Sequence, residues 1–437
     1  MADIVTSRVF VDGEKGITAA KLNDITASSV IQPAFYTSKP TAGTADPTDI
    51  ALILKSGAYA QVPVSTLGGS ATQAQIWSTR LRSFNAIGNP NFEVDQRTAG
   101  AGSTAGAGLF AIDRWFFNRA AGTTIGASGA QFAPSSPDIA LPGTNFRISR
   151  CCFRVTLTTQ QVSLAASDFL QLNQAIEGPN WRELSTDVHS VSLLARSSVA
   201  NLSFGLTLAD PPTPTKSLTK LCALGAANTW TLIQLPNLPV WPSGNFLATP
   251  SSPGYQIRIV LASGSSVTAP ANDTWQTGNF WGAVGQSNFA ASPVNSTFDI
   301  AFVQHEPGPV CSTFIDKPFS QSLDECLRYY CKSYDYATRP GTATSNGRMP
   351  FIVPSIAGLN IAAGANSFPK PMARVPSVIN TWAIDGTANS CTDNTNGGNK
   401  TTTVTIFSER SFTQFTLGTA STSGALITCQ YIADTGW

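Results

Sequence analysis

Two aromatic-rich stretches carry the residue types that bind sugars. Residues 275–281 read W-Q-T-G-N-F-W, and residues 241–246 read W-P-S-G-N-F. Sugar rings stack their C–H faces on Trp and Tyr, and their hydroxyls pair with Asn, Asp and Arg. The pattern predicts a glycan-binding set in loops, to which the similar surroundings of residue 181 add one more Trp. That set is Trp181, Trp241, Trp275, Trp281, Asn245 and Asn279.

Core packing is the competing interpretation of each of these tryptophans, because Trp is highly buried on average. The Gly-rich run at 99–106 is a different kind of candidate, since such runs can cradle phosphate. It is not followed by the Gly-Lys-Ser/Thr of a phosphate-binding loop, so we interpret it as a flexible loop.

Histidine chemistry has few places in this chain, which contains only His189 and His305. His189 lies in an alternating strand pattern, where a packed or surface strand residue is favoured over a general base. His305 stands beside Glu306 and Pro307, and we expect it in a loop at the end of a strand. With two His and no CxxC pair, a zinc site is not expected.

Paired carboxylates test whether the chain cuts polysaccharides, since glycosidases use two acids. The sequence Asp113-Arg114-Trp115 is more typical of an Asp–Arg ion pair or a turn than of a catalytic acid. The sequence also lacks the fixed-period repeat that would indicate a β-helix hydrolase. We therefore expect no enzymatic activity, no catalytic residue and no cofactor. Carboxylates could hold a structural Ca²⁺, but no EF-hand-like loop is present. The candidate carboxylates are Glu93, Asp95, Asp113, Glu177, Glu183, Asp299 and Glu306.

Charge and composition favour β structure and disfavour nucleic-acid binding. Charged residues make up 12% of the 437 residues, the net charge is +1, and no Lys/Arg run is present. The chain has 35 Gly and 28 Pro, which interrupt long helices. No apolar run is long enough to span a bilayer, so membrane insertion is not expected. The N-terminus is acidic rather than signal-like, so synthesis in a reducing cytosol and free, mostly buried thiols are expected.

Strand and turn signals divide the chain into four segments. Residues 1–30 combine a short strand with a short helix, and 31–84 form a small β module or extended arm. Residues 85–316 contain many alternating strand candidates separated by turns, which predicts a β-sandwich or jelly roll. Residues 317–437 begin with a helix over 322–331, where Ser322 and Glu325 have capping-box spacing, and then return to strands. The predicted fold class is mainly β.

Ordered short motifs across residues 89–437 resemble those of phage and prophage tail or fibre proteins. Asn89-Pro90-Asn91-Phe92-Glu93 followed by Asp113-Arg114-Trp115 is similar to the opening of their carbohydrate-binding-module-like jelly roll. Further similarity lies at 174–178 and 302–308. Residues 314–334, with Cys326-Leu327-Arg328-Tyr329-Tyr330, resemble the link into the family's C-terminal β domain, which 368–376 and 431–434 also echo.

The resemblance implies an adhesive structural protein of a tailed-phage virion, a tail fibre or receptor-binding protein. Residues 16–23 resemble fibre N-termini that dock onto the particle. The implied partners are other virion proteins of the tail, portal-collar or capsid and a host cell-surface polysaccharide, and the implied assembly is a homotrimer made in the host bacterial cytoplasm. A purely structural head fibre, collar or decoration protein is the first alternative, and a polysaccharide depolymerase is the second. The implied docking residues are Phe10, Ile17, Leu22 and Ile25.

Overall fold

The chain divides into two compact units, residues 1–78 and 79–437. The computed structural model describes residues 50–55, 58–63, 84–106, 110–120, 122–133, 150–211, 215–354 and 361–436. In the first unit these form an antiparallel hairpin of β1 (Ile50–Lys55) and β2 (Ala58–Pro63). Strands were expected at both places in the 31–84 segment. The predicted docking residues Phe10, Ile17, Leu22 and Ile25 lie outside the described residues.

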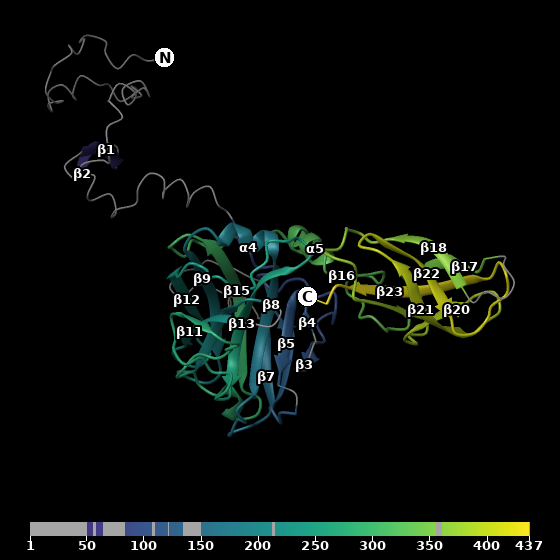
Figure 1. Cartoon of the computed structure of the whole chain (residues 1–437), viewed down its shortest axis with the longest axis horizontal. Helices are drawn as coiled ribbons and strands as arrows, with labels where there is room; N and C mark the ends of the chain where they lie inside the picture. Colours follow the sequence, from purple (N-terminus) through teal and green to yellow (C-terminus); the bar gives the residue numbers. More distant parts are fainter. Residues whose placement is uncertain are drawn as a thin grey trace, which may run out of the picture. The chain divides into compact units, whose positions relative to one another are not determined.

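Two antiparallel sheets face each other in the jelly-roll domain of the second unit (Figure 1). The seven-stranded sheet runs in the order β14 (Trp275–Thr277), β11 (Lys216–Ala223), β10 (Ser203–Ala209), β13 (Pro253–Ser263), β8 (Phe169–Glu177), β5 (Trp115–Arg119) and β4 (Phe110–Ile112). The six-stranded sheet runs in the order β12 (Thr231–Leu238), β9 (His189–Ser197), β15 (Thr297–Pro307), β7 (Cys152–Thr159), β6 (Gly126–Phe132) and β3 (Ser103–Thr104). The predicted fold class, mainly β with a jelly roll, is confirmed.

Alternation of side chains explains why these strands form a two-layer core. On β13, Ile257, Ile259 and Leu261 point into the core, and on β8, Leu170 and Leu172 do the same. The intervening residues of both strands lie on the outer face of the seven-stranded sheet, because successive side chains in a strand point to opposite sides. Each fully buried aliphatic or aromatic side chain contributes about 1.5–3 kcal/mol. The core therefore fixes which polar residues share the outer face.

The C-terminal domain is an eight-stranded antiparallel sheet in which the last strand of the order pairs back with a strand near its start. The sheet contains β16 (Tyr330–Lys332), β17 (Met349–Ile352), β18 (Ile361–Ser367), β19 (Val378–Trp382), β20 (Ser390–Asp393), β21 (Asn399–Phe407), β22 (Ser411–Leu417) and β23 (Leu426–Asp434). Its order is β16-β23-β17-β18-β22-β21-β20, and β20 also pairs with β23. The second half of β23 pairs with β16 on one side and β19 on the other. The predicted C-terminal β domain is therefore present.

The helices differ in detail from the sequence-based expectation. The helix at the start of the C-terminal domain is present, but it is α5 (Phe319–Leu327) and begins three residues earlier than predicted. Ser322 is not its N-cap, because Pro318 holds that position and the Ser322 amide already donates to the Pro318 carbonyl. Residues 330 and 331, which were assigned to the helix, belong to β16 instead. A short helix, α4 (Gly178–Leu184), was not expected, and a 3₁₀ turn, η2 (Phe289–Ala291), precedes β15. Neither α-helix in the described ranges is long and apolar enough to cross a membrane.

One arginine joins the jelly-roll domain to the C-terminal domain. The Arg97 guanidinium lies 3.8 Å from the centre of the Phe110 ring and 4.1 Å from that of Tyr330. It also forms an ion pair with Asp434, whose Oδ1 accepts from Nη2 at 3.2 Å. Planar guanidinium groups suit this combination of ring stacking and bidentate pairing. Arg97 thus binds β4 of one domain to β16 and β23 of the other.

Asn89 and Trp115 fix the loop that precedes Arg97 within the jelly-roll domain. Asn89 Nδ2 donates to the carbonyls of Val94 and Asp113, and Asn89 Oδ1 accepts from the Val94 amide. The indole of Trp115 donates to the Asn89 carbonyl. Asn89 adopts a φ of 48°, a left-handed conformation that Asn tolerates better than most residues. The motif therefore has a structural role, in which it holds the first loop against the start of β5.

Replacing Arg97 with Met tests the junction. The variant keeps an unbranched apolar side chain but removes the ion pair and the guanidinium stacking, and it leaves Asp434 without its cation. We expect the free energy of unfolding to fall by about 3 kcal/mol, as is usual when one partner of a buried pair is removed. Arg182→Met is the control, because Arg182 is 66% exposed in its side chain and should change stability little. An unchanged thermal midpoint for the Arg97 variant would show that Arg97 does not hold the two domains together.

Candidate functional site

Three of the four predicted sugar-binding tryptophans lie in one aromatic cluster. Trp241 has its ring centre 6.3 Å from Trp181 and 5.3 Å from Trp275. Phe246 stacks on Trp181 at 5.7 Å and contacts Trp241 at 5.1 Å. Trp241 is only 8% exposed, and its indole donates to the Leu184 carbonyl at the end of α4. The cluster belongs to the core of the jelly roll, and its role in sugar binding stays a prediction.

Beneath Trp241, both histidines form a buried hydrogen-bonded chain. The Tyr255 hydroxyl lies 2.7 Å from His305 Nδ1, and His305 Nε2 lies 2.9 Å from His189 Nδ1. His305 is fully buried inside β15, so the expected loop position is wrong: the strand continues to Pro307. His189 is buried in β9 and stacks on Trp241. Neither imidazole ring reaches solvent, so this hydrogen-bonded series of three side chains is part of the packed core.

Polar side chains form rows across the outer face of the seven-stranded sheet. Strand pairing places Phe116, Asn173, Arg258 and Thr207 opposite one another on β5, β8, β13 and β10. In the next row, Asn118 of β5 lies opposite Gln171 of β8. These residues alternate with buried Leu and Ile of the core, so all of them point outward. Amide side chains are therefore concentrated on this outer face of the sheet.

Three amide oxygens on this face are buried and have no hydrogen-bond partner among the described residues. They are Oδ1 of Asn118, Oε1 of Gln171 and Oδ1 of Asn173. A buried polar atom without a partner costs about 1–3 kcal/mol. Gln171 is 3% exposed, while Asn118 and Asn173 are partly exposed. The face therefore carries hydrogen-bonding capacity that the protein itself does not use.

Trp281 borders this row of amides. Its indole donates to Asn279 Oδ1 at 2.6 Å, and the same oxygen accepts from Arg258 Nη1 at 3.2 Å. The Arg258 guanidinium lies 4.9 Å from the Trp281 ring centre, and Phe169 of β8 contacts the ring from another side. Thr207 of β10 donates to the Trp281 carbonyl and fixes the loop on the sheet. The predicted pair Trp281 and Asn279 thus belongs to the same face as the unpaired amides.

Arg258 is a buried cation without a carboxylate partner among the described residues. It is 3% exposed and donates to Gln256 Oε1 at 2.9 Å as well as to Asn279. Burial lowers the pKa of its guanidinium to about 10, and Asp210 partly opposes this. The arginine remains charged at neutral pH and makes the centre of the face a strong hydrogen-bond donor.

Sequence reasoning missed most of this face. Asn118, Gln171, Asn173, Gln256 and Arg258 come from separate strands, and none stands in an aromatic-rich loop. The alternation of Leu170-Gln171-Leu172-Asn173 shows that the amides share one side of β8. It does not show that strands β5 and β13 bring further polar residues beside them. Asn245, which was predicted, lies apart from this row: its backbone amide donates to Asp210, and its side chain is exposed.

Most of the candidate carboxylates have structural partners. Asp113 accepts from the amide and the side chain of Gln96, Asp95 accepts from Thr98, and Glu306 accepts from Ser312. Glu177 accepts from Arg328, and Asp299 accepts from two arginines. Within the described ranges, no group of three His, Cys, Asp or Glu residues is placed to hold a metal ion. All eight cysteines are free, and most are buried.

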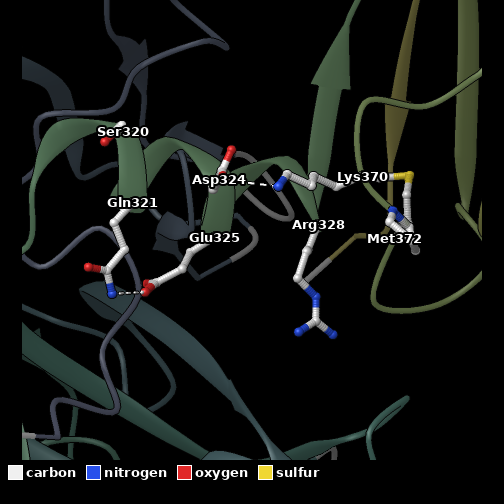
Figure 2. A pocket seen from close by; sticks show the side chains of 8 residues that line it. Ser320, Gln321, Asp324, Glu325, Arg328, Lys370 and Met372 are labelled. Atoms are coloured by element: carbon white, nitrogen blue, oxygen red, sulfur yellow. Dashed lines mark hydrogen bonds and ion pairs between the residues drawn. The ribbon is translucent and has the colours of Figure 1, made fainter.

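A pocket of about 670 Å³ lies along α5, next to the loop at 370–372. Figure 2 shows Asp324 and Lys370 pointing toward each other, with 3.0 Å between their charged atoms, and Gln321 donating to Glu325. Arg328 points away from this pair and is bound to Glu177 of the jelly-roll domain. Each charged group that lines the pocket already has an ion-pair partner: Asp324 and Lys370 pair with each other, and Glu325 pairs with Lys317. The outer face of the seven-stranded sheet is therefore the better candidate site.

No family model matches the chain, and no curated protein sequence matches it. Among solved structures, the chain is similar to TmCBM61 in complex with beta-1,4-galactotriose, with 12% identity over 52% of this chain and 99% of that one and a TM-score of 0.27. It is similar to the family 11 carbohydrate-binding module from Clostridium thermocellum, with 8% identity, 48% and 98% coverage and a TM-score of 0.24. It is also similar to tailspike protein 4 of bacteriophage CBA120, with 8% identity over 51% of this chain and 21% of that one and a TM-score of 0.25.

The buried histidines predict a loss of stability in acid. Burial lowers the pKa of His189 to about 4, and burial beside His189 lowers the pKa of His305 well below 6.5. Between pH 6.5 and 4 the unfolded chain binds more protons than the folded protein, so stability falls as the pH falls. For His189 alone the loss across this window is on the order of 3 kcal/mol. Asp113 acts in the opposite direction, because burial raises its pKa to about 6.

The measurement is the thermal midpoint of the wild type and of His189→Asn between pH 7 and 4.5. The Asn side chain is polar and fits near the position of Nδ1, but it does not titrate. We expect a shallower pH dependence in the variant. Parallel curves for the two proteins would show that His189 does not cause the acid sensitivity.

Proposed function

We propose that this protein is an adhesive structural protein of a tailed-phage particle that binds a surface glycan. The binding surface is the outer face of the seven-stranded sheet of its jelly roll. The observation that carries the proposal is the row of buried amide oxygens on Asn118, Gln171 and Asn173, beside Trp281, for which no described residue is a hydrogen-bond partner. The ordered fibre-like motifs across residues 89–437 support the phage assignment.

A sugar ring suits this combination of groups. Its C–H face would lie on Trp281, and its hydroxyls would pair with the amide groups of Asn118 and Asn173, two side chains that are partly exposed. The hydroxyl oxygens in turn can accept hydrogen bonds from amide nitrogens of the same side chains. Gln171 and Arg258 lie deeper and hold the outer groups in position. Binding would satisfy polar atoms that are unpaired in the free protein, which is the source of selectivity for a polyhydroxylated ligand.

A single site of this kind binds weakly, so the proposal includes multivalent display. In a homotrimer, an assembly that the fibre resemblance implies, three copies of the face would raise the avidity for a repetitive host polysaccharide without new contacts. The N-terminal segment would attach the trimer to other virion proteins. The binding is passive, and the protein is proposed to have no catalytic activity. An assay of reducing ends after incubation with host polysaccharide tests whether the protein has catalytic activity. Release of new reducing ends would identify a depolymerase.

One observation favours the purely structural alternative of a head fibre, collar or decoration protein. Trp181, Trp241 and Trp275 are packed against one another rather than displayed. Electron microscopy of the intact particle distinguishes the alternatives. A position on the capsid far from the tail would support a decoration role.

Trp281→Ala tests the proposed sugar platform. The full-length chain is applied to an array of bacterial surface glycans, and the strongest ligand is then titrated by calorimetry. We expect the variant to bind at least about tenfold more weakly, a loss of about 1.4 kcal/mol. Phe407→Ala is the control, because Phe407 is an aromatic residue of the C-terminal domain that is 41% exposed. Equal affinity of wild type and Trp281→Ala would rule out this face as the binding site.

Asn173→Leu separates binding from folding. If the amide serves a ligand, its replacement by an apolar side chain of similar size removes an unpaired polar group, so the thermal midpoint stays equal or rises while glycan binding is lost. Asn89→Leu is the contrasting variant, since its amide makes hydrogen bonds within the protein and its loss should destabilise the fold by about 2 kcal/mol. A marked drop in the midpoint of Asn173→Leu would indicate a structural amide instead.

A further inference from the structure

The six-stranded sheet carries a charged row on its own outer face. Strand pairing places Asp299 of β15 directly opposite Arg154 of β7 and Arg196 of β9. The three side chains alternate with buried core residues such as Phe298 and Ile300, so they point away from the core. This face lies on the opposite side of the sandwich from the amide face that contains Trp281, because each sheet has one side on the shared core.

Asp299 neutralises only one of the two arginines. Arg154 uses Nε and Nη2 to donate to both oxygens of Asp299 at 2.8 Å. Arg196 donates from Nε alone to Oδ2, also at 2.8 Å. The row therefore keeps a net positive charge. Hydrogen bonds to the described residues use neither Nη1 nor Nη2 of Arg196.

Aromatic rings hold both guanidinium groups flat against the sheet. Arg154 lies 3.4 Å from the centre of the Phe132 ring, and Arg196 lies 4.7 Å from that of Trp230. The Arg154 side chain is 26% exposed and that of Arg196 is 14% exposed, while Asp299 is buried. Stacked guanidinium groups are pre-organised, so little conformational freedom is lost when their terminal N–H groups bind an oxyanion.

A pocket adjoins the row. It has a volume of about 220 Å³ and is lined by apolar and small polar residues of β9 and β12 and of the segment after β15. Leu194 lines the pocket and lies two residues before Arg196 on the same side of β9, where it packs with Trp230. Among the described residues that line the pocket there is no ion pair, and its polar groups include Ser192, Gln234 and Ser312.

We propose that this row and pocket form a second binding site, which takes an acidic saccharide. The oxyanion of the saccharide binds the free terminal N–H groups of Arg196, and the adjoining ring occupies the pocket beside Leu194. A carboxylate or a phosphate ester suits the guanidinium fork, whereas a neutral sugar leaves the excess charge unmatched. The site does not depend on Trp281 or on the amides of the other sheet, so the two proposals can fail separately.

The test is binding of the full-length chain to three polymers: polygalacturonate, a glycerol-phosphate polymer and neutral dextran. We expect at least one acidic polymer to bind more tightly than dextran, with an affinity that falls as NaCl is raised from 50 to 500 mM. Arg196→Gln should weaken this binding at least tenfold. The polymer that binds identifies the oxyanion as carboxylate or phosphate.

Two further variants separate binding from folding. Arg182→Gln removes an exposed arginine of α4 and should leave the affinity unchanged. Arg196→Lys keeps the charge but loses the planar fork, so it should bind the acidic polymer with an intermediate affinity. Trp281→Ala should leave acidic-polymer binding unchanged. Equal binding of acidic and neutral polymers, no binding of either acidic polymer, or an unchanged affinity in a folded Arg196→Gln variant would overturn the proposal.

Discussion

The stacking of Arg97 between Phe110 and Tyr330, with Asp434 as its counter-ion, connects the two β domains of the second unit. A buried cation is tolerated only where its charge and its N–H groups are matched. Here the matching groups come from both domains, so neither can move away without exposing an unpaired charge. Neighbouring contacts depend on the same arrangement: Arg114 stacks on Tyr329, and Gln96 binds Asp113 next to it.

This junction gives a physical meaning to the fibre-like motifs. Asn89 and Asp113 have hydrogen bonds that close the first loop onto β5, and the tyrosines of the second motif receive the arginines of the first. The motifs are therefore parts of one interface rather than of a binding site.

The two outer faces of the sandwich differ in the kind of polar group that they carry. On the seven-stranded sheet, the amide oxygens of Asn118, Gln171 and Asn173 are buried and have no hydrogen-bond partner in the part of the chain that the structure describes. On the six-stranded sheet, Asp299 is shared by two arginines, and positive charge remains. The first face suits neutral hydroxyls and the second suits an oxyanion.

The sequence by itself determined the mainly β class, most of the long strands and the presence of a helix near residue 322. Alternating apolar residues in 255–261 and 297–303 are sufficient for this, because the side-chain period of a strand is a local property. Helix boundaries were predicted less well: Pro318 rather than Ser322 is the N-cap of α5, although Pro318 has no side chain that could accept a hydrogen bond from the first amides. Only the tertiary structure decided which tryptophans pack in the core and which stands beside the amides. Trp241 and Trp281 occur in similar local sequences, and strand register across residues 116, 173 and 258 places the polar row beside only one of them. Register between strands far apart in the chain depends on the packing of the whole core, which no local pattern contains.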